Sequence, residues 1–244
     1  MNGAGTGIRP IPKPEIWFAD LTHTGQGISA ATFPSGISYV LSYAKQDLGS
    51  EFDFKLFRFP SHLGQALREA SPAMLCFSNY SWNFKLAYKF ACLAKGQNPE
   101  LITVFGGPNF PTDQRERLEF LRGRPGIDFY IELEGELGLV DLVQKLSECD
   151  FDPNKLKQRG ECAPNTSYII DDRLICGSTE RIKDINILPS PYLSGVFEVD
   201  PIIWTGSGRP GDVRFLALFA LTGLAPRTRF SGTTTNAPKR NSTT

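Results

Sequence analysis

The sequence lacks the features of membrane, secreted and nucleic-acid-binding proteins. No apolar stretch approaches the roughly 20 residues that a transmembrane helix needs. Residues 1–14 contain glycine and proline where a signal peptide has an apolar run. The 26 basic and 26 acidic residues cancel, so no global field favours nucleic acid or an anionic membrane surface. We therefore expect a cytoplasmic protein with no membrane span and no nucleic-acid partner.

The sequence is also poor in residues that bind metals or form disulfides. It has two histidines and five cysteines, and the cysteines are scattered without a C-x-x-C pair. An odd number of scattered cysteines indicates reduced thiols rather than a zinc site or a disulfide framework. We expect free, mostly buried thiols at Cys76, Cys92, Cys149, Cys162 and Cys176.

The chain contains a repeated alternation of short apolar runs and amphipathic segments. Each of five runs of strand length precedes a segment whose apolar residues recur at helical spacing. Because parallel neighbours need right-handed helical crossovers, this alternation over about 135 residues predicts a doubly wound α/β domain with a mostly parallel five-stranded sheet. The expected strands are 15–21, 52–59, 73–78, 101–105 and 127–131, and the expected helices are 36–48, 63–70, 84–95, 112–121 (with Thr112 as N-cap) and 137–146.

The alternation stops near residue 150. Residues 164–176 have the pattern of two strands joined by a turn at Asp171 and Asp172, and residues 184–192 contain the prolines of an extended connector. From residue 205 onward the chain has no steady hydrophobic period. We therefore predict a flexible leader (1–14), an α/β domain (15–150), a linker with a β-hairpin (151–203) and a disordered tail (204–244).

Ligands of doubly wound sheets bind beyond the carboxyl ends of the strands, so the loops there contain the candidate site. Gly106 and Gly107 follow the fourth strand, where bare backbone allows a large flat ligand to approach and bind the amides. A tight turn explains the same pair more simply, because the spacing is neither a dinucleotide fingerprint nor a P-loop.

Three other loops carry polar or aromatic side chains. Residues 79–82 combine amide, hydroxyl and indole groups, as a cofactor cleft does. His23 follows the first strand, where an imidazole can ligate a metal or bind a ligand amide. Glu134 and Glu136 form a carboxylate pair suited to acid–base chemistry. The simpler alternatives are an N-capping turn, a solvated histidine and charges favoured by a helix dipole.

Five stretches carry a resemblance to a known family: FADLTHTGQGISAATFPSGISYVLSYA, LCFSNYSWN, VFGGPNFP, IDFYIELEGE and LPSPYLSG. They occur in the order seen in cobalamin-dependent radical S-adenosylmethionine proteins, and residues 15–203 resemble the N-terminal cobalamin (vitamin B12)-binding domain of that family. The resemblance implies a flavodoxin-like, Rossmann-like domain that holds cobalamin at the carboxyl edge of its sheet. It also implies a following barrel that docks on the domain and carries a C-x-x-x-C-x-x-C iron–sulfur motif. Enzymes of this family methylate, rearrange or otherwise modify unactivated carbon centres.

The resemblance further implies which residues contact the cofactor. The D-x-H-x-x-G motif of cobalamin-dependent mutases is not matched, because His23 falls one position late, so we expect base-off, His-off binding. We expect no catalytic residue and no protein metal site here, with the iron–sulfur cluster and S-adenosylmethionine bound only by the full-length parent. The implied cobalamin contacts are Thr22, His23, Thr24, Gly25, Asn79, Ser81, Trp82, Gly106, Gly107, Pro108, Asn109, Glu134 and Gly135.

Two other functions stay open. The first is a cofactor-free flavodoxin-like or receiver-like interaction domain, although the aspartates and lysine of a phosphoacceptor site are not evident. The second is a nucleotide-binding oxidoreductase, which the missing third glycine and acidic ribose contact disfavour. A cobalamin-binding module agrees with more of the motifs than either alternative does.

The sequence contains no C-x-x-x-C-x-x-C, and the family likeness ends near Ile203, shortly before that motif is expected. When residues 212–220 (DVRFLALFA) are back-translated and read from the third base of each codon, the shifted string can read C-P-F-S-C-T-F-C. We interpret the tail as the product of a frameshift, natural or from sequencing, between Ile203 and Val213. Without the cluster's thiolate ligands, this truncated fragment is expected to be catalytically incompetent alone.

The nucleotide sequence tests this interpretation. We expect U as the third base of the codons for Asp212, Leu216 and Phe219, because each U then begins a cysteine codon of the shifted frame. Resequencing the gene across these codons measures this directly. Other bases at those positions would remove the cysteines and refute the frameshift.

Overall fold

The first five strands form a parallel sheet in the order β2-β1-β3-β4-β5. The strand order reverses at β1 and β3, and ligands of doubly wound sheets bind at such a switch point. The computed structural model describes residues 13–23 and 34–196, so most of the expected leader and the whole expected tail lie outside the described residues. The strands are β1 (Glu15–Ala19), β2 (Asp53–Phe57), β3 (Met74–Ser78), β4 (Ile102–Gly106) and β5 (Phe129–Ile131).

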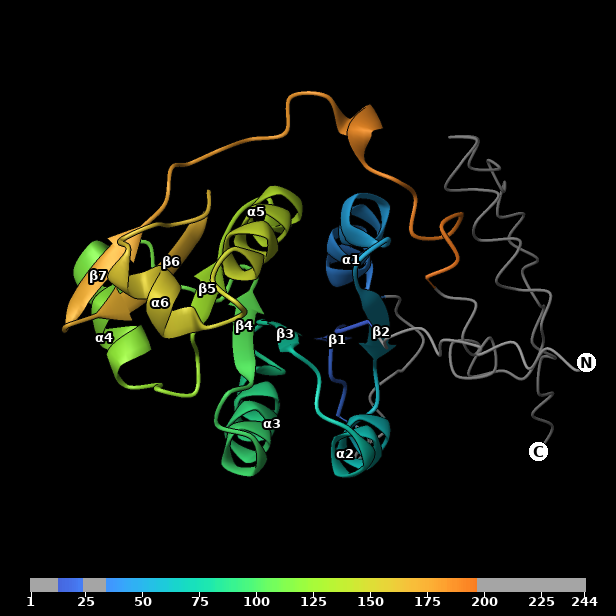
Figure 1. Cartoon of the computed structure of the whole chain (residues 1–244), viewed down its shortest axis with the longest axis horizontal. Coiled ribbons are helices and arrows are strands. Elements are labelled where there is room, and N and C mark those ends of the chain that lie inside the picture. The colour runs from blue at the N-terminus through green and yellow to red at the C-terminus, as the bar shows by residue number, and fades with distance from the viewer. Residues whose placement is uncertain (1–12, 24–33, 197–244) are drawn as a thin grey trace, which may run out of the picture.

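Helices cover both faces of this sheet, as Figure 1 shows. Helices α1 and α5 pack side by side on one face, and α2 and α3 lie on the other. The predicted doubly wound α/β fold is confirmed. The helices are α1 (Ser35–Leu48), α2 (Pro60–Glu69), α3 (Phe84–Gln97), α4 (Gln114–Arg122), α5 (Gly135–Ser147) and α6 (Pro153–Gln158).

The alternation of side chains along the strands builds two cores. Ile16 and Phe18 point toward α1 and α5, whereas Trp17 and Ala19 point toward α2 and α3. Successive side chains of a strand face opposite sides of the sheet, so a strand covered on both faces is apolar throughout. This explains why all five residues of β3 are buried.

The hairpin expected in the linker extends the sheet to seven strands. β6 (Thr166–Ile170) pairs antiparallel with β5, and β7 (Arg173–Cys176) pairs antiparallel with β6. Asp171 and Asp172 have φ values of 47° and 60°, the left-handed conformation that two-residue hairpin turns need. The hairpin and its turn are confirmed, but the sheet has seven strands instead of five. The cause is that the hairpin covers the free edge of β5, a pairing that local periodicity cannot indicate.

The N-cap of helix α4 lies one residue later than expected. The prediction of Thr112 as N-cap is wrong: the Asp113 Oδ1 atom accepts hydrogen bonds from the backbone N–H groups of Arg115 (2.9 Å) and Glu116 (3.1 Å). A carboxylate both satisfies these groups and interacts favourably with the positive end of the helix.

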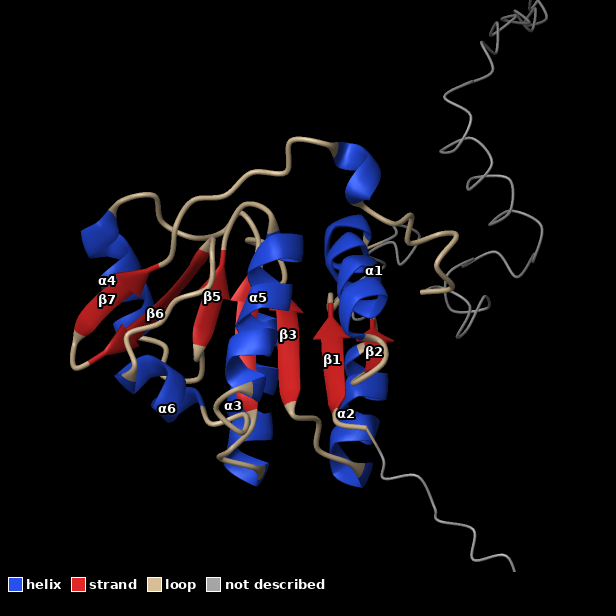
Figure 2. Ribbon diagram, turned by 45° about the horizontal axis from the view of Figure 1, so that its top comes forward, coloured by secondary structure: helices blue, strands red, loops and turns tan. Residues whose placement is uncertain are grey.

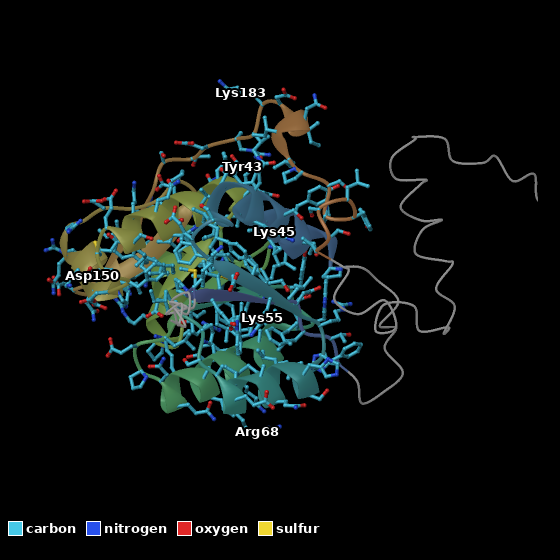
Figure 3. All side chains as sticks on the ribbon, turned by 45° about the vertical axis from the view of Figure 1, so that its right-hand side comes forward. Tyr43, Lys45, Lys55, Arg68, Asp150 and Lys183 are labelled. Carbon is cyan, nitrogen blue, oxygen red and sulfur yellow. The ribbon has the colours of Figure 1, made fainter. Side chains whose placement is uncertain are left out.

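After β7 the chain returns across the carboxyl edge of the sheet toward α1, as Figure 2 shows. This connector includes a short 3-10 helix, Ile185–Ile187, where the sequence predicted an extended segment. Ser194 fastens it to α1, because its Oγ lies 3.0 Å from the Ser42 Oγ and its carbonyl accepts a 3.2 Å bond from Lys45 Nζ. Lys45 is labelled in Figure 3 on the side of α1 beside the returning connector.

Among the described residues, no helix combines the length and apolarity needed to cross a bilayer.

The loops after β3 and β4 pack tightly against each other. Gly107 has a φ of 127°, and a Cβ atom there would lie 2.7 Å from the backbone oxygen of Asn79. The Asn79 N–H donates a 2.6 Å bond to the Gly106 carbonyl. Only glycine fits this conformation and this close approach, so the tight-turn explanation of the glycine pair holds.

Gly107→Ala is expected to lower the free energy of unfolding by about 2 kcal/mol or more, because it adds backbone strain and a steric clash. Urea denaturation monitored by circular dichroism measures the change. Gly96→Ala is the matched control: Gly96 lies in α3, where an added Cβ atom would meet no other atom within 4 Å, so stability should stay equal or rise by up to about 1 kcal/mol. Equal stability of the two variants would contradict the packing argument.

Candidate functional site

A cavity of about 480 Å³ opens at the carboxyl edge of the sheet, between the first turns of α1 and α5. Its inner wall belongs to the core on the α1 and α5 side and is apolar. Burial raises the pKa of the Cys76 thiol in this wall, which keeps the group neutral. An apolar cavity with few polar groups suits a flat apolar ligand or part of one. The inner wall consists of Phe18, Cys76, Val104, Ile131 and Leu139, and the mouth includes Gly36, Tyr80, Gly106, Gly107, Pro108, Leu133 and Gly135.

Two asparagines of the expected site bind each other. The Asn79 Nδ2 atom donates to the Asn109 carbonyl (2.9 Å) and to the Tyr130 hydroxyl (3.0 Å), and its Oδ1 atom accepts from Asn109 Nδ2 (3.0 Å). Tyr130 in turn donates to the Gly107 carbonyl (2.8 Å). The Asn79 side chain, which is fully buried, therefore fixes the two loops to each other.

A buried carboxylate, which the sequence analysis did not single out, lies beneath the first loop. The Asp20 carboxylate accepts hydrogen bonds from Arg58 Nη1 (2.5 Å), Ser78 Oγ and Asn83 Nδ2 (3.1 Å). A charged partner and two neutral donors satisfy this carboxylate as a buried charge requires. Its position directly after an apolar strand is the signal that could have identified it.

The exposed part of the site contains an aromatic pair. Trp82 is 65% exposed, and its ring stacks on Tyr80 with centroids 4.5 Å apart and an interplanar angle of 7°. The carbonyl of Trp82 lies 2.8 Å from His23 Nε2. Ser81 and His23 are exposed and Thr22 is buried, whereas the predicted contacts Thr24 and Gly25 lie outside the described residues.

The loop after β5 is fixed by ion pairs. Arg117 contacts Glu132 through both guanidinium Nη atoms at 2.8 and 2.6 Å, and Arg181 Nε donates to Glu134 Oε1 at 2.7 Å. Burial is the main cause that raises the pKa of Glu136, and the negative charge of Glu134 also raises it. The predicted carboxylate pair therefore differs in environment, since Glu134 has a cationic partner. Arg117 and Glu132 were missed because 15 positions separate them.

The five cysteines are all free. Cys76 and Cys149 are buried and Cys162 is half-buried, whereas Cys92 and Cys176 are exposed on the outer side of α3 and the edge strand β7. Within 13–23 and 34–196, no cluster of three or more His, Cys, Asp or Glu side chains could hold a metal ion.

The chain matches methyltransferases over part of their length. It is 29% identical over 199 residues to 2-(S-pantetheinyl)-carbapenam-3-carboxylate methyltransferase of Streptantibioticus cattleyicolor, covering 79% of this chain and 27% of that protein. It is 28% identical over 167 residues to the cobalamin-dependent radical SAM methyltransferase TokK of Streptomyces tokunonensis, covering 64% of this chain and 22% of TokK. The chain thus spans about a quarter of these relatives.

Solved structures show the same fold. The cobalamin-dependent S-adenosylmethionine radical enzyme OxsB with aqua-cobalamin and S-adenosylmethionine bound superposes with a TM-score of 0.57 at 15% identity, covering 75% of this chain and 25% of OxsB. The apo form of OxsB superposes with a TM-score of 0.53 at 17% identity, covering 77% of this chain and 25% of OxsB.

Residues 28–143 of this chain match the family model described as B12 binding domain.

Proposed function

We propose that the chain binds cobalamin at the carboxyl edge of the sheet, and the observation that carries this proposal is the apolar cavity beside Gly107. The cavity of about 480 Å³ is too small for the corrin macrocycle, so only an appendage such as the nucleotide base would enter it. The apolar wall formed by Cys76, Val104 and Leu139 suits a flat aromatic base. The residues present therefore fit the cofactor.

The macrocycle would rest on the loops around the cavity mouth. The bare backbone of Gly106 and Gly107 permits close approach, and the exposed Trp82 ring, supported by Tyr80, offers a flat apolar surface. Asn79 and Asn109 would act by holding these loops in place, since their side chains bind each other. The other proposed contacts are Thr22, His23, Thr24, Gly25, Ser81, Pro108, Glu134 and Gly135.

Base-off, His-off binding is proposed because His23 falls one position late for the D-x-H-x-x-G motif. An axial histidine needs one free ring nitrogen and a partner that orients the other nitrogen. The Asp20 carboxylate, the acidic group after the same strand, is already occupied by Arg58, Ser78 and Asn83. The His23 Nε2 atom lies within hydrogen-bond distance of the Trp82 carbonyl.

The chain would be the cofactor module of an enzyme that methylates or otherwise modifies a carbon centre. Bound cobalamin supplies a cobalt centre that carries the transferred group, and the domain orients and shields it. In the parent enzyme, a barrel with the C-x-x-x-C-x-x-C motif would bind the iron–sulfur cluster and S-adenosylmethionine and dock on this edge. The sequence lacks that motif, so we expect cofactor binding without turnover by the 244 residues alone.

Titrating the purified chain with hydroxocobalamin, and with cobalamin reduced to the Co(II) state, tests the binding mode. We expect the absorption spectrum to change to the base-off form, and the Co(II) electron paramagnetic resonance spectrum to lack splitting from an axial nitrogen. His23→Ala should leave both spectra unchanged. A free-cofactor spectrum throughout would favour the cofactor-free interaction domain, and nitrogen splitting that His23→Ala abolishes would overturn His-off binding.

Trp82→Ala is expected to weaken cobalamin binding about tenfold, the loss expected for one aromatic contact of roughly 1–1.5 kcal/mol. The free energy of unfolding should change by less than about 0.5 kcal/mol, because the ring is largely exposed. Spectroscopic titration measures affinity and urea denaturation measures stability. Leu93→Ala, an exposed apolar residue of α3 outside the cavity lining, is the control and should retain wild-type affinity. Unchanged affinity in the Trp82 variant would exclude the ring from the site.

A further inference from the structure

Leu133 combines a strained backbone with an exposed apolar side chain. Its φ is 56°, in the left-handed region that residues with a Cβ atom rarely adopt. Its side chain is 54% exposed and lines the cavity mouth. Among the described residues, the other non-glycine positions with positive φ are aspartate or asparagine, which tolerate this conformation, except for Phe151, which packs against the core. Leu133 alone among them has both strain and apolar exposure.

The residues on either side hold Leu133 in this conformation. The Glu132 carboxylate forms the two-fold contact with Arg117, and Arg181 binds the Glu134 carboxylate. Both carboxylates are more than three-quarters buried, where ion pairs are screened less than at the surface. Strain of this kind persists only where the surroundings over-determine it.

The buried residue Asn165 fixes the same segment from behind. Its backbone carbonyl accepts a 2.8 Å bond from the Glu132 N–H, and its Nδ2 atom donates to the Glu134 carbonyl at 3.3 Å. The same Nδ2 atom donates to the Glu180 carbonyl at 2.9 Å. Asn165 thus joins the loop after β5 to the connector after β7, and both residues that flank Leu133 are anchored through their backbone.

We propose that Leu133 is a ligand-binding residue, an apolar edge of the cavity mouth that a bound cobamide covers. This inference rests on the proposed function. A half-exposed leucine adds little to folding, and its backbone conformation opposes folding. The conformation becomes favourable when a ligand at the mouth removes the remaining apolar surface from water. Its position in the cavity lining beside Gly135 and Glu132 places that ligand at the cavity mouth.

Two substitutions separate the side chain from the backbone. Leu133→Gly removes the side chain and relieves the backbone strain. Leu133→Asn replaces the apolar side chain with a polar one, in a residue type that tolerates positive φ. We expect both to weaken binding of hydroxocobalamin by the 244-residue chain about tenfold. The thermal midpoint of Leu133→Gly should stay equal or rise by up to about 3 °C. Spectroscopic titration and circular dichroism measure the two quantities.

Leu93→Asn is the matched control, because Leu93 is 52% exposed on α3, has a helical backbone and lies outside the cavity lining. It should bind cobalamin as the wild type does. Wild-type cobalamin affinity in both Leu133 variants would overturn the inference and leave the proposed function standing. That result is expected if Leu133 contacts another domain and not the ligand. A lower thermal midpoint for Leu133→Gly would show that the residue serves folding. A wild-type chain that does not bind cobalamin would reject both proposals.

Discussion

The close contact between Gly107 and the backbone of Asn79 is the constraint on which the site depends. It brings the loops after β3 and β4 together, and the amide pair of Asn79 and Asn109 can form only at that distance. Tyr130 extends the same contact to β5 through the Gly107 carbonyl. The cavity mouth is therefore built from backbone held in place by buried hydrogen bonds, with the apolar wall below it.

Cross-links continue around this edge of the sheet. The Arg117–Glu132 pair connects α4 to the loop after β5, and Asn165 connects that loop to the chain after β7. A site whose loops are already ordered loses less conformational entropy when a ligand binds. The strain at Leu133 fits the same arrangement, because its flanking bonds hold an apolar group where a ligand can cover it. In the proposed role of Leu133, stability and binding would place opposite demands on this loop.

The sequence indicated which loops form the site, but it did not indicate the side-chain contacts that hold these loops in place. The glycine pair after β4 lines the cavity, as expected from its position. Trp82, after β3, lies outside the cavity lining but stacks on Tyr80, which is part of it. The network around Asp20 was missed because Arg58 and Ser78 stand 38 and 58 positions away. Asn165 was missed for the same reason, since its partners Glu134 and Glu180 stand 31 and 15 positions away.

Local information determined the doubly wound sheet, the five parallel strands and the hairpin turn at Asp171 and Asp172, because periodicity and turn chemistry act over a few residues. The family of the domain could also be identified from short motifs in order. Tertiary structure alone decided that the hairpin pairs with β5 and that Leu133 adopts a left-handed conformation. Each of these outcomes depends on which of several locally acceptable partners is nearest in space, and only the folded chain brings those partners together.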